Sequence, residues 1–217
     1  AFNILCVVTG QNARSVEKLY RFYRKQNFRW LQFIPCIDPF DRADGEPCYT
    51  LTADSYGDFL VRLFDLWFDD LRHGEYISIR HLDNWLSILL GERPEACNMA
   101  GCCSVQFVVE GDGGVYPCDF YVLDEWRLGN IGETGLADMQ NSETAKRFVR
   151  QSLAVPEECK TCQWFGLCRN GCRRDRDILP NGVIGQNIYC TAYKKFFSER
   201  FRQLAQSIEC IQRMQYR

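Results

Sequence analysis

The chain has 217 residues, of which 46% are hydrophobic and 25% are charged, and its formal net charge is -2. This length fits one large domain or two modest ones, and the apolar share is enough for a buried core. The small net charge gives no indication of nucleic-acid binding, and the sequence has no run of 18 apolar residues that could cross a membrane.

The first 36 residues have the pattern of a β-α-β unit. Phe2–Val8 is a nearly continuous apolar run without the features of a signal peptide, and it predicts a strand covered on both faces. Ser15 can cap the helix that follows, and a second strand, Phe28–Ile34, ends at Pro35. Such a crossover predicts parallel strands. One unit is too little for a sheet, so we expect further strands outside this chain.

Two helices are predicted after a loop at residues 36–50. Aromatic and aliphatic residues recur at helical spacing between Ala53 and Arg72, and a shorter helix is expected near Leu82–Leu90. Gly91 fits the position just past that helix, and Pro94 follows it. The composition changes after Pro94, which predicts one domain at residues 1–92 and a second at residues 93–217.

The second part of the chain predicts a small α+β domain. Val105–Val109 and Val115–Cys118 are the arms of a hairpin, because a glycine-rich turn separates them. A short helix is expected near Leu136–Gln151. A long helix with one apolar face is expected at Thr191–Gln215.

The chain has 13 cysteines, which is unusual for its length. A secreted disulfide scaffold is one explanation, but such scaffolds are short and poor in core residues, and their cysteine count is even. Thiolates that bind metal in a reducing compartment fit a long apolar chain better, so a cytoplasmic location is expected.

Most of the cysteines lie in the second part of the chain, at spacings typical of metal ligands. A zinc ion and a cubane iron–sulfur cluster each take four thiolates, and eight ligands would serve two such sites. Four nearby arginines could stabilise a negatively charged cluster, and three apolar residues could shield it from water. The plausible ligands are Cys97, Cys102 or Cys103, Cys118, Cys159, Cys162, Cys168, Cys172 and Cys190; the arginines are Arg169, Arg173, Arg174 and Arg176; the apolar residues are Trp164, Phe165 and Leu167.

The cysteine spacing resembles the SPASM domain, a C-terminal extension of many radical S-adenosylmethionine enzymes. The shared motif is Gly113-x4-Cys118, followed by Cys-x2-Cys-x5-Cys-x3-Cys from Cys159 to Cys172 and by a last cysteine, Cys190. Either Cys97 or Cys103 fits the cysteine that precedes Gly113 in this motif. The resemblance implies an α/β chain: the C-terminal portion of a partial (β/α) barrel, then a cysteine-rich SPASM domain with a β-hairpin and a long C-terminal helix.

The chain is also similar to the anaerobic sulfatase-maturating enzymes, over nearly its whole length. The stretches "QFVVEGDGGVYPCDFYVLDEWRLGNI", "ECKTCQWFGLCRNGCRRDRD", "LQFIPCIDP" and "SIRHLDNW" carry the likeness. It implies two auxiliary [4Fe-4S] clusters, although the choice between Cys102 and Cys103 stays open. One cluster would use Cys97, Cys103, Cys118 and Cys172, and the other would use Cys159, Cys162, Cys168 and Cys190.

The same resemblance implies a reaction. A radical derived from S-adenosylmethionine would take a Cβ hydrogen from a Cys or Ser of a nascent sulfatase, which would become Cα-formylglycine. Asp119 would be the general base in a dry pocket, and an auxiliary cluster would accept the remaining electron. Ile37 would lie near the adenine of S-adenosylmethionine, and flavodoxin or ferredoxin would donate electrons.

The chain departs from the family pattern at one motif. No three of its cysteines have the Cys-x3-Cys-x2-Cys spacing that holds the reactive third [4Fe-4S] cluster. The chain is therefore expected to be the C-terminal part of a longer enzyme and to be inactive alone. Two other functions stay open: a SPASM maturase that cross-links or epimerises peptides, and a zinc-binding structural or interaction domain.

Several other candidate residues are expected to have no role in the chemistry. Cys6 and Cys36 lie on or beside strands and fit small core residues, while Cys48 and Cys210 have no neighbour at ligand spacing. The remaining residues of this kind are His73, His81 and Asp83, which are expected at helix ends.

Overall fold

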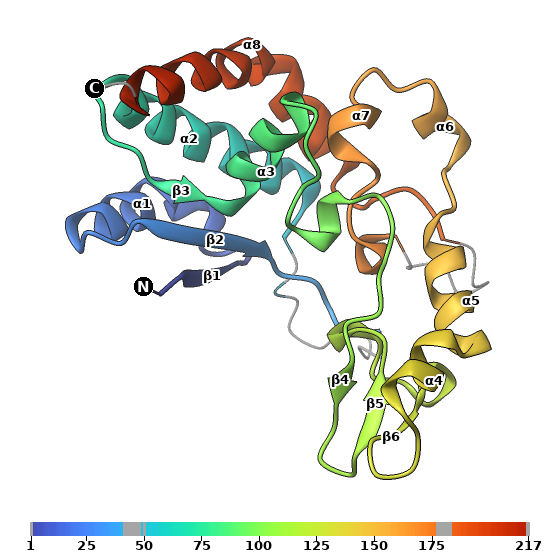
Figure 1. Ribbon diagram of the computed structural model, residues 1–217. Helices are drawn as coiled ribbons and strands as arrows, with labels where there is room; N and C mark the ends of the chain where they lie inside the picture. Colours follow the sequence, from blue (N-terminus) through green and yellow to red (C-terminus); the bar gives the residue numbers. More distant parts are fainter. Residues whose placement is uncertain (1, 41–48, 50, 177–183, 216–217) are drawn as a thin grey trace. The chain divides into compact units, whose positions relative to one another are not determined.

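The computed structural model describes residues 2–40, 49, 51–176 and 184–215, and Figure 1 shows how their helices and strands are arranged. The chain forms two compact units. The first comprises Ala1–Ala96, Gly166–Cys168 and Ile188–Arg217, and the second comprises Cys97–Phe165 and Arg169–Asn187. This division differs from the predicted domains 1–92 and 93–217, because the last helix belongs to the first unit.

The first unit contains a parallel sheet of three strands, β1 (Ile4–Val8), β2 (Trp30–Pro35) and β3 (Ser78–Ile79), in that order. Ile4 pairs with Leu31, which confirms the predicted parallel crossover. The strand β3 was not predicted, because two residues are too few for a periodic pattern.

The prediction that both faces of this sheet are covered is wrong for the described residues. Leu5, Val7 and Trp30 are 60%, 50% and 52% exposed, whereas Val8 and Leu31 are buried. Alternate residues of a strand point to opposite faces, so one face is in the core and the other is open.

The longer helices of the first unit are α1 (Val16–Lys25), α2 (Ala53–Arg72), α3 (Arg80–Leu89) and α8 (Cys190–Gln215). The bounds of α2 confirm the prediction, and its start is fixed by Oγ of Thr52, which accepts a hydrogen bond from the amide of Ser55. Aromatic rings fill the space between the helices, and the ring of Trp85 on α3 stacks on that of Phe196 on α8 with centroids 4.7 Å apart.

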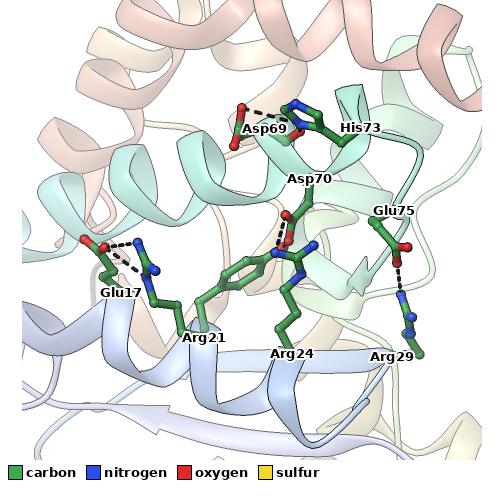
Figure 2. Close-up of polar contacts among 9 residues, drawn as sticks. Glu17, Arg21, Arg24, Arg29, Asp69, Asp70, His73 and Glu75 are labelled. Atoms are coloured by element: carbon green, nitrogen blue, oxygen red, sulfur yellow. Dashed lines mark hydrogen bonds and ion pairs between the residues drawn. The ribbon is translucent and has the colours of Figure 1, made fainter.

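A polar network joins α1 to α2 (Figure 2). The buried carboxylate of Asp70 accepts a hydrogen bond of 2.9 Å from the hydroxyl of Tyr20 and lies 3.0 Å from the guanidinium of Arg24. Burial raises the pKa of Tyr20, and the hydrogen bond to Asp70 adds to that rise, so the hydroxyl stays a donor. The network therefore fixes the position of α1 relative to α2.

The second unit contains an antiparallel sheet of β4 (Val108–Val109), β5 (Gly114–Tyr116) and β6 (Gly129–Asn130). The predicted hairpin is confirmed, with shorter arms and with a third strand that was not predicted. Gly113 has a φ of +82° at the turn, a conformation that favours glycine.

The helix predicted at Leu136–Gln151 is two helices, α4 (Leu136–Asn141) and α5 (Glu143–Ser152). Ser142 separates them because it has extended backbone angles and its Oγ accepts a hydrogen bond from the amide of Ala145. The shorter elements are α6 (Glu157–Lys160), α7 (Phe165–Cys168) and the 3-10 helices η1 (Ala13–Ser15), η2 (Cys97–Met99), η3 (Asp119–Tyr121), η4 (Asp124–Trp126) and η5 (Arg173–Asp175).

Candidate metal centre

Six of the predicted ligand cysteines lie in the second unit, and electrostatic interactions link the thiols of four of them, Cys97, Cys103, Cys118 and Cys172. Burial raises the pKa of the Cys103 thiol, and a charge on Cys97 would raise it further. Burial raises the pKa of Cys172 as well, and Asp175, Cys103 and Cys118 add to that rise. Cys103 also contributes, after burial, to the raised pKa of Cys118, so the thiol of Cys103 interacts with each of the other three.

Two of these sulfur atoms accept hydrogen bonds from the backbone. The Sγ of Cys172 caps η5 by accepting a hydrogen bond of 3.4 Å from the amide of Arg174. Burial raises the pKa of Cys118 to about 12, and the backbone N–H of Phe120 opposes this rise. Such N–H groups stabilise a thiolate and are among the features that tune iron–sulfur clusters.

The structure distinguishes the adjacent Cys102 and Cys103 by their exposure and hydrogen bonding. Cys102 is exposed, whereas Cys103 is half-buried and its amide donates a hydrogen bond of 2.8 Å to Oγ of Ser152. Ser152 is completely buried at the end of α5. The side chain that interacts with the other three thiols is thus the one whose backbone is held by α5.

An aromatic cluster covers two of these cysteines. The rings of Tyr121, Trp126 and Phe148 form a buried group, and Cys103 and Cys118 pack against it. Trp164, Phe165 and Leu167 were predicted to shield a metal site, but the aromatic residues in contact with these two thiols are different. The sequence offered no signal for this cluster, because its three rings lie on three separate elements.

A left-handed turn leads into Cys172. Arg169, Asn170 and Gly171 have φ angles of 49°, 64° and 66°. A β-carbon on Gly171 would overlap with the side-chain nitrogen of Asn187, so a larger residue at this position would have to displace that side chain. Strained backbone of this kind often lies at functional sites.

The other four predicted ligands are divided between the two units. Cys159 is buried in the second unit, and its Sγ lies 3.8 Å from Oδ1 of Asn170. Cys162 also lies in the second unit, whereas Cys168 and Cys190 lie in the first.

Within the described ranges, no three His, Cys, Asp or Glu side chains are grouped closely enough to hold a single metal ion. Each thiolate of a cubane binds a different iron, so cubane ligands stand farther apart than the ligands of one zinc ion. Thiols with a raised pKa must lose their protons when metal binds, so loading of the site would release protons.

Asp119 begins η3 directly after Cys118, and its Oδ1 accepts a hydrogen bond of 3.2 Å from the Cys118 thiol. The carboxylate is exposed, so the dry pocket expected around it is not formed by the described residues of its own unit.

The other predicted site residues lie in the first unit. Ile37 is half-buried, two residues after the end of β2. His81 and Asp83 are in the first turn of α3, where Asp83 accepts hydrogen bonds from Ser78 and Tyr76. His73 caps the exposed end of α2. Cys6 and Cys36 were predicted to be core residues, but they are only half-buried and are not among the buried core residues, and Cys48 is outside the described residues.

None of the helices in the described part of the chain is both long and apolar enough to span a bilayer.

Residues 97–163 match the family model of SPASM, the iron-sulfur cluster-binding domain. The cysteine-type anaerobic sulfatase-maturating enzymes of Clostridium perfringens and Clostridium novyi are each 47% identical to this chain over 94% of its length. The serine-type anaerobic sulfatase-maturating enzyme of Bacteroides thetaiotaomicron is 28% identical over 90% of the chain. These matches cover 55%, 54% and 51% of the three relatives, so the chain spans about half their length.

Solved structures show the same relationship. The structure of native anSMEcpe with bound AdoMet and Cp18Cys peptide has a TM-score of 0.89 and 47% identity, covering 94% of this chain and 56% of that chain. Native anSMEcpe with bound AdoMet has a TM-score of 0.88 at the same identity, covering 55% of that chain. The mixed α/β architecture with a long last helix is therefore confirmed.

Proposed function

Because this chain corresponds to a part of the anaerobic sulfatase-maturating enzymes, we propose that it is part of an enzyme that oxidises a sulfatase side chain to Cα-formylglycine. The observation that carries this proposal is the group of four thiols in the second unit. Cys97, Cys103 and Cys118 lie within the residues that match the iron-sulfur cluster-binding domain. Cys172 lies outside that match, but its thiol interacts with those of Cys103 and Cys118. The proposed ligands of the first auxiliary cluster are Cys97, Cys103, Cys118 and Cys172.

The residues present fit such a cluster chemically. Cys103 and Cys118 are covered by aromatic rings, and backbone N–H groups point at the sulfurs of Cys118 and Cys172. When bound, the cluster would supply a site for one electron. The second auxiliary cluster would use Cys159, Cys162, Cys168 and Cys190, and its ligand set follows from family likeness alone.

The Cys-x3-Cys-x2-Cys motif is absent from the sequence, so S-adenosylmethionine and its cluster would be held largely by residues outside this chain. Ile37, just after β2, is our candidate contact to the adenine. The chain alone would therefore be catalytically incomplete.

Asp119 is the proposed general base. Its carboxylate accepts a hydrogen bond from the Cys118 thiol in the structure. A metal-bound Cys118 has no proton to donate, so the carboxylate would be released to take a proton from the thiol or hydroxyl of the substrate. The exposed position of Asp119 leaves it open to a peptide.

The degree of likeness favours a cysteine substrate. The chain is 47% identical to cysteine-type enzymes and 28% identical to a serine-type enzyme. A sulfatase polypeptide is the proposed partner, and flavodoxin or ferredoxin is the proposed electron donor in the cytoplasm.

The test uses the whole protein that carries this chain, purified without oxygen. It is incubated with S-adenosylmethionine, a reductant and one of two sulfatase-derived peptides that differ only in Cys or Ser. Mass spectrometry should detect the aldehyde product on the Cys peptide. A cross-linked or epimerised product without aldehyde would favour another maturase, and a colourless zinc protein would favour a structural domain.

A further inference from the structure

Two buried arginines flank the candidate cluster site of the second unit. Arg173 is 3% exposed and Arg176 is 1% exposed. A guanidinium group stays protonated in proteins, so each arginine carries a buried positive charge. Arg173 directly follows Cys172 in the sequence, and the Nε of Arg176 donates a hydrogen bond to the carbonyl of Cys172, so both cations lie beside a proposed ligand.

Groups around the aromatic cluster bind the guanidinium of Arg173. Its Nη1 donates a hydrogen bond of 2.9 Å to the carbonyl of Phe148, and its Nη2 donates one of 2.9 Å to Oε1 of Gln151. Its guanidinium carbon lies 4.7 Å from the ring centres of Trp126 and Phe148, and 4.8 Å from that of Tyr121. The rings that hold this cation are the ones that pack against Cys103 and Cys118.

Arg176 is held by the backbone beside the same thiols. Its Nη2 and Nη1 donate to the carbonyls of Ser152 and Ala154 over 3.0 and 3.2 Å, at the end of α5. Its Nε donates to the carbonyl of Cys172 over 3.3 Å. Both charges are therefore fixed by packing before any cluster binds.

We propose that Arg173 and Arg176 are positioning residues whose fixed charges raise the reduction potential of the cluster bound by Cys97, Cys103, Cys118 and Cys172. This role rests on the proposed function, because it needs the cluster. Reduction adds one electron to a group that already carries the charge of four thiolates. A nearby buried cation stabilises the reduced form more than the oxidised form, and solvent screens it little.

The chain offers a matched control for the aromatic contact. Arg147 lies over the same Trp126 ring at 4.6 Å, and its Nη2 donates to the carbonyl of Glu125. Arg147 is exposed, so solvent screens its charge, whereas Arg173 and Arg176 are buried. Arg147→Gln thus removes a screened cation from the ring and leaves both buried cations in place.

The test is a redox titration followed by electron paramagnetic resonance, on the whole anaerobically purified protein that carries this chain, with dithionite as the reductant. For Arg173→Gln, the ratio of reduced to oxidised cluster at the wild-type midpoint should fall about tenfold, equivalent to about 59 mV for one electron. For Arg173→Lys, this ratio should stay within about twofold of the wild-type value, and the melting temperature of the protein should be lower. Arg147→Gln should match wild type in its potentials.

Two results would overturn the arginine role alone: a loaded Arg173→Gln protein with wild-type potentials, or an equal shift in Arg147→Gln. If Arg173→Gln does not fold, Arg173→Lys decides, because a tenfold fall in a variant that keeps the charge would contradict the proposal. A wild-type protein without iron and sulfide would overturn the proposed cluster as well, so the two failures are distinguishable.

Discussion

The amide of Cys103 donates a hydrogen bond of 2.8 Å to the hydroxyl of Ser152, although 49 residues separate them in the sequence. The hydroxyl donates in turn to the carbonyl of Val149 over 2.6 Å. The end of α5 thereby fixes the backbone of a proposed cluster ligand.

Ser152→Ala tests this relationship. The substitution leaves the amide of Cys103 without its acceptor in a partly buried position, which should cost about 1–3 kcal/mol of unfolding free energy. The iron content after gel filtration should fall together with the stability. Ser198→Ala is the control, because its exposed hydroxyl donates to the carbonyl of Lys194 within one helix. Equal iron contents in the two variants would contradict the role given to Ser152.

Gly171→Ala tests the turn before Cys172. A left-handed φ of 66° is costly for alanine, by about 1–2 kcal/mol, and the methyl group would also overlap with Asn187. Denaturant unfolding should show the loss, and the cluster absorption should weaken. Gly111→Ala is the control, since a β-carbon there meets no atom within 4 Å. A fully loaded and stable Gly171→Ala protein would show that the turn does not position Cys172.

Asp119→Asn separates chemistry from cluster binding. The amide cannot accept the substrate proton, so turnover should fall by about 10²- to 10⁴-fold, while iron and sulfide per chain stay at the wild-type level. Asp124→Asn, at the exposed start of η4, is the control. Product formation is followed by mass spectrometry. Wild-type turnover of Asp119→Asn would remove it from the mechanism.

His81 predicts a pH dependence of stability. Burial lowers its pKa to about 4, and the charge of Arg80 adds to this effect. In the unfolded chain His81 becomes protonated near pH 6.5, whereas in the folded chain it becomes protonated only near pH 4. The free energy of unfolding should therefore fall as the pH drops through this window. The loss should reach about 3 kcal/mol at most.

His81→Phe should flatten that part of the curve while keeping the edge-to-face contact with Trp85. Urea unfolding at several pH values measures the slope, and His73→Gln at the exposed end of α2 is the control histidine. An unchanged slope in His81→Phe would show that other groups cause the pH dependence.

The sequence predicted the elements that carry a strong local pattern. The β-α-β unit, the bounds of α2, the hairpin around Gly113 and the long last helix are confirmed. Two-residue strands such as β3 have no detectable period, and the split between α4 and α5 depends on one capping serine.

The sequence predicted cysteine thiolates as the ligands of the candidate site, but it did not predict the residues that hold these cysteines in place. Cysteine spacing pointed to a set of candidate ligands with Cys102 or Cys103 left open, and only the family resemblance implied the grouping of Cys97, Cys103, Cys118 and Cys172. Ser152 and the aromatic cluster come from distant segments. Contacts of that kind are set by tertiary packing, which leaves no periodic signal in a single sequence. The open face of β1 was missed for the same reason, since an apolar strand does not reveal how many of its faces are covered.

The most direct test of the central claim compares two adjacent cysteines. Cys103→Ala and Cys102→Ala proteins are purified without oxygen, and iron, sulfide, zinc and the visible spectrum are measured per chain. We predict that Cys103→Ala loses about four irons, the content of one cubane, whereas Cys102→Ala keeps the wild-type content. Equal iron contents in the two variants, or zinc in place of iron in the wild-type protein, would contradict the assignment of this site to an iron–sulfur cluster held by Cys103.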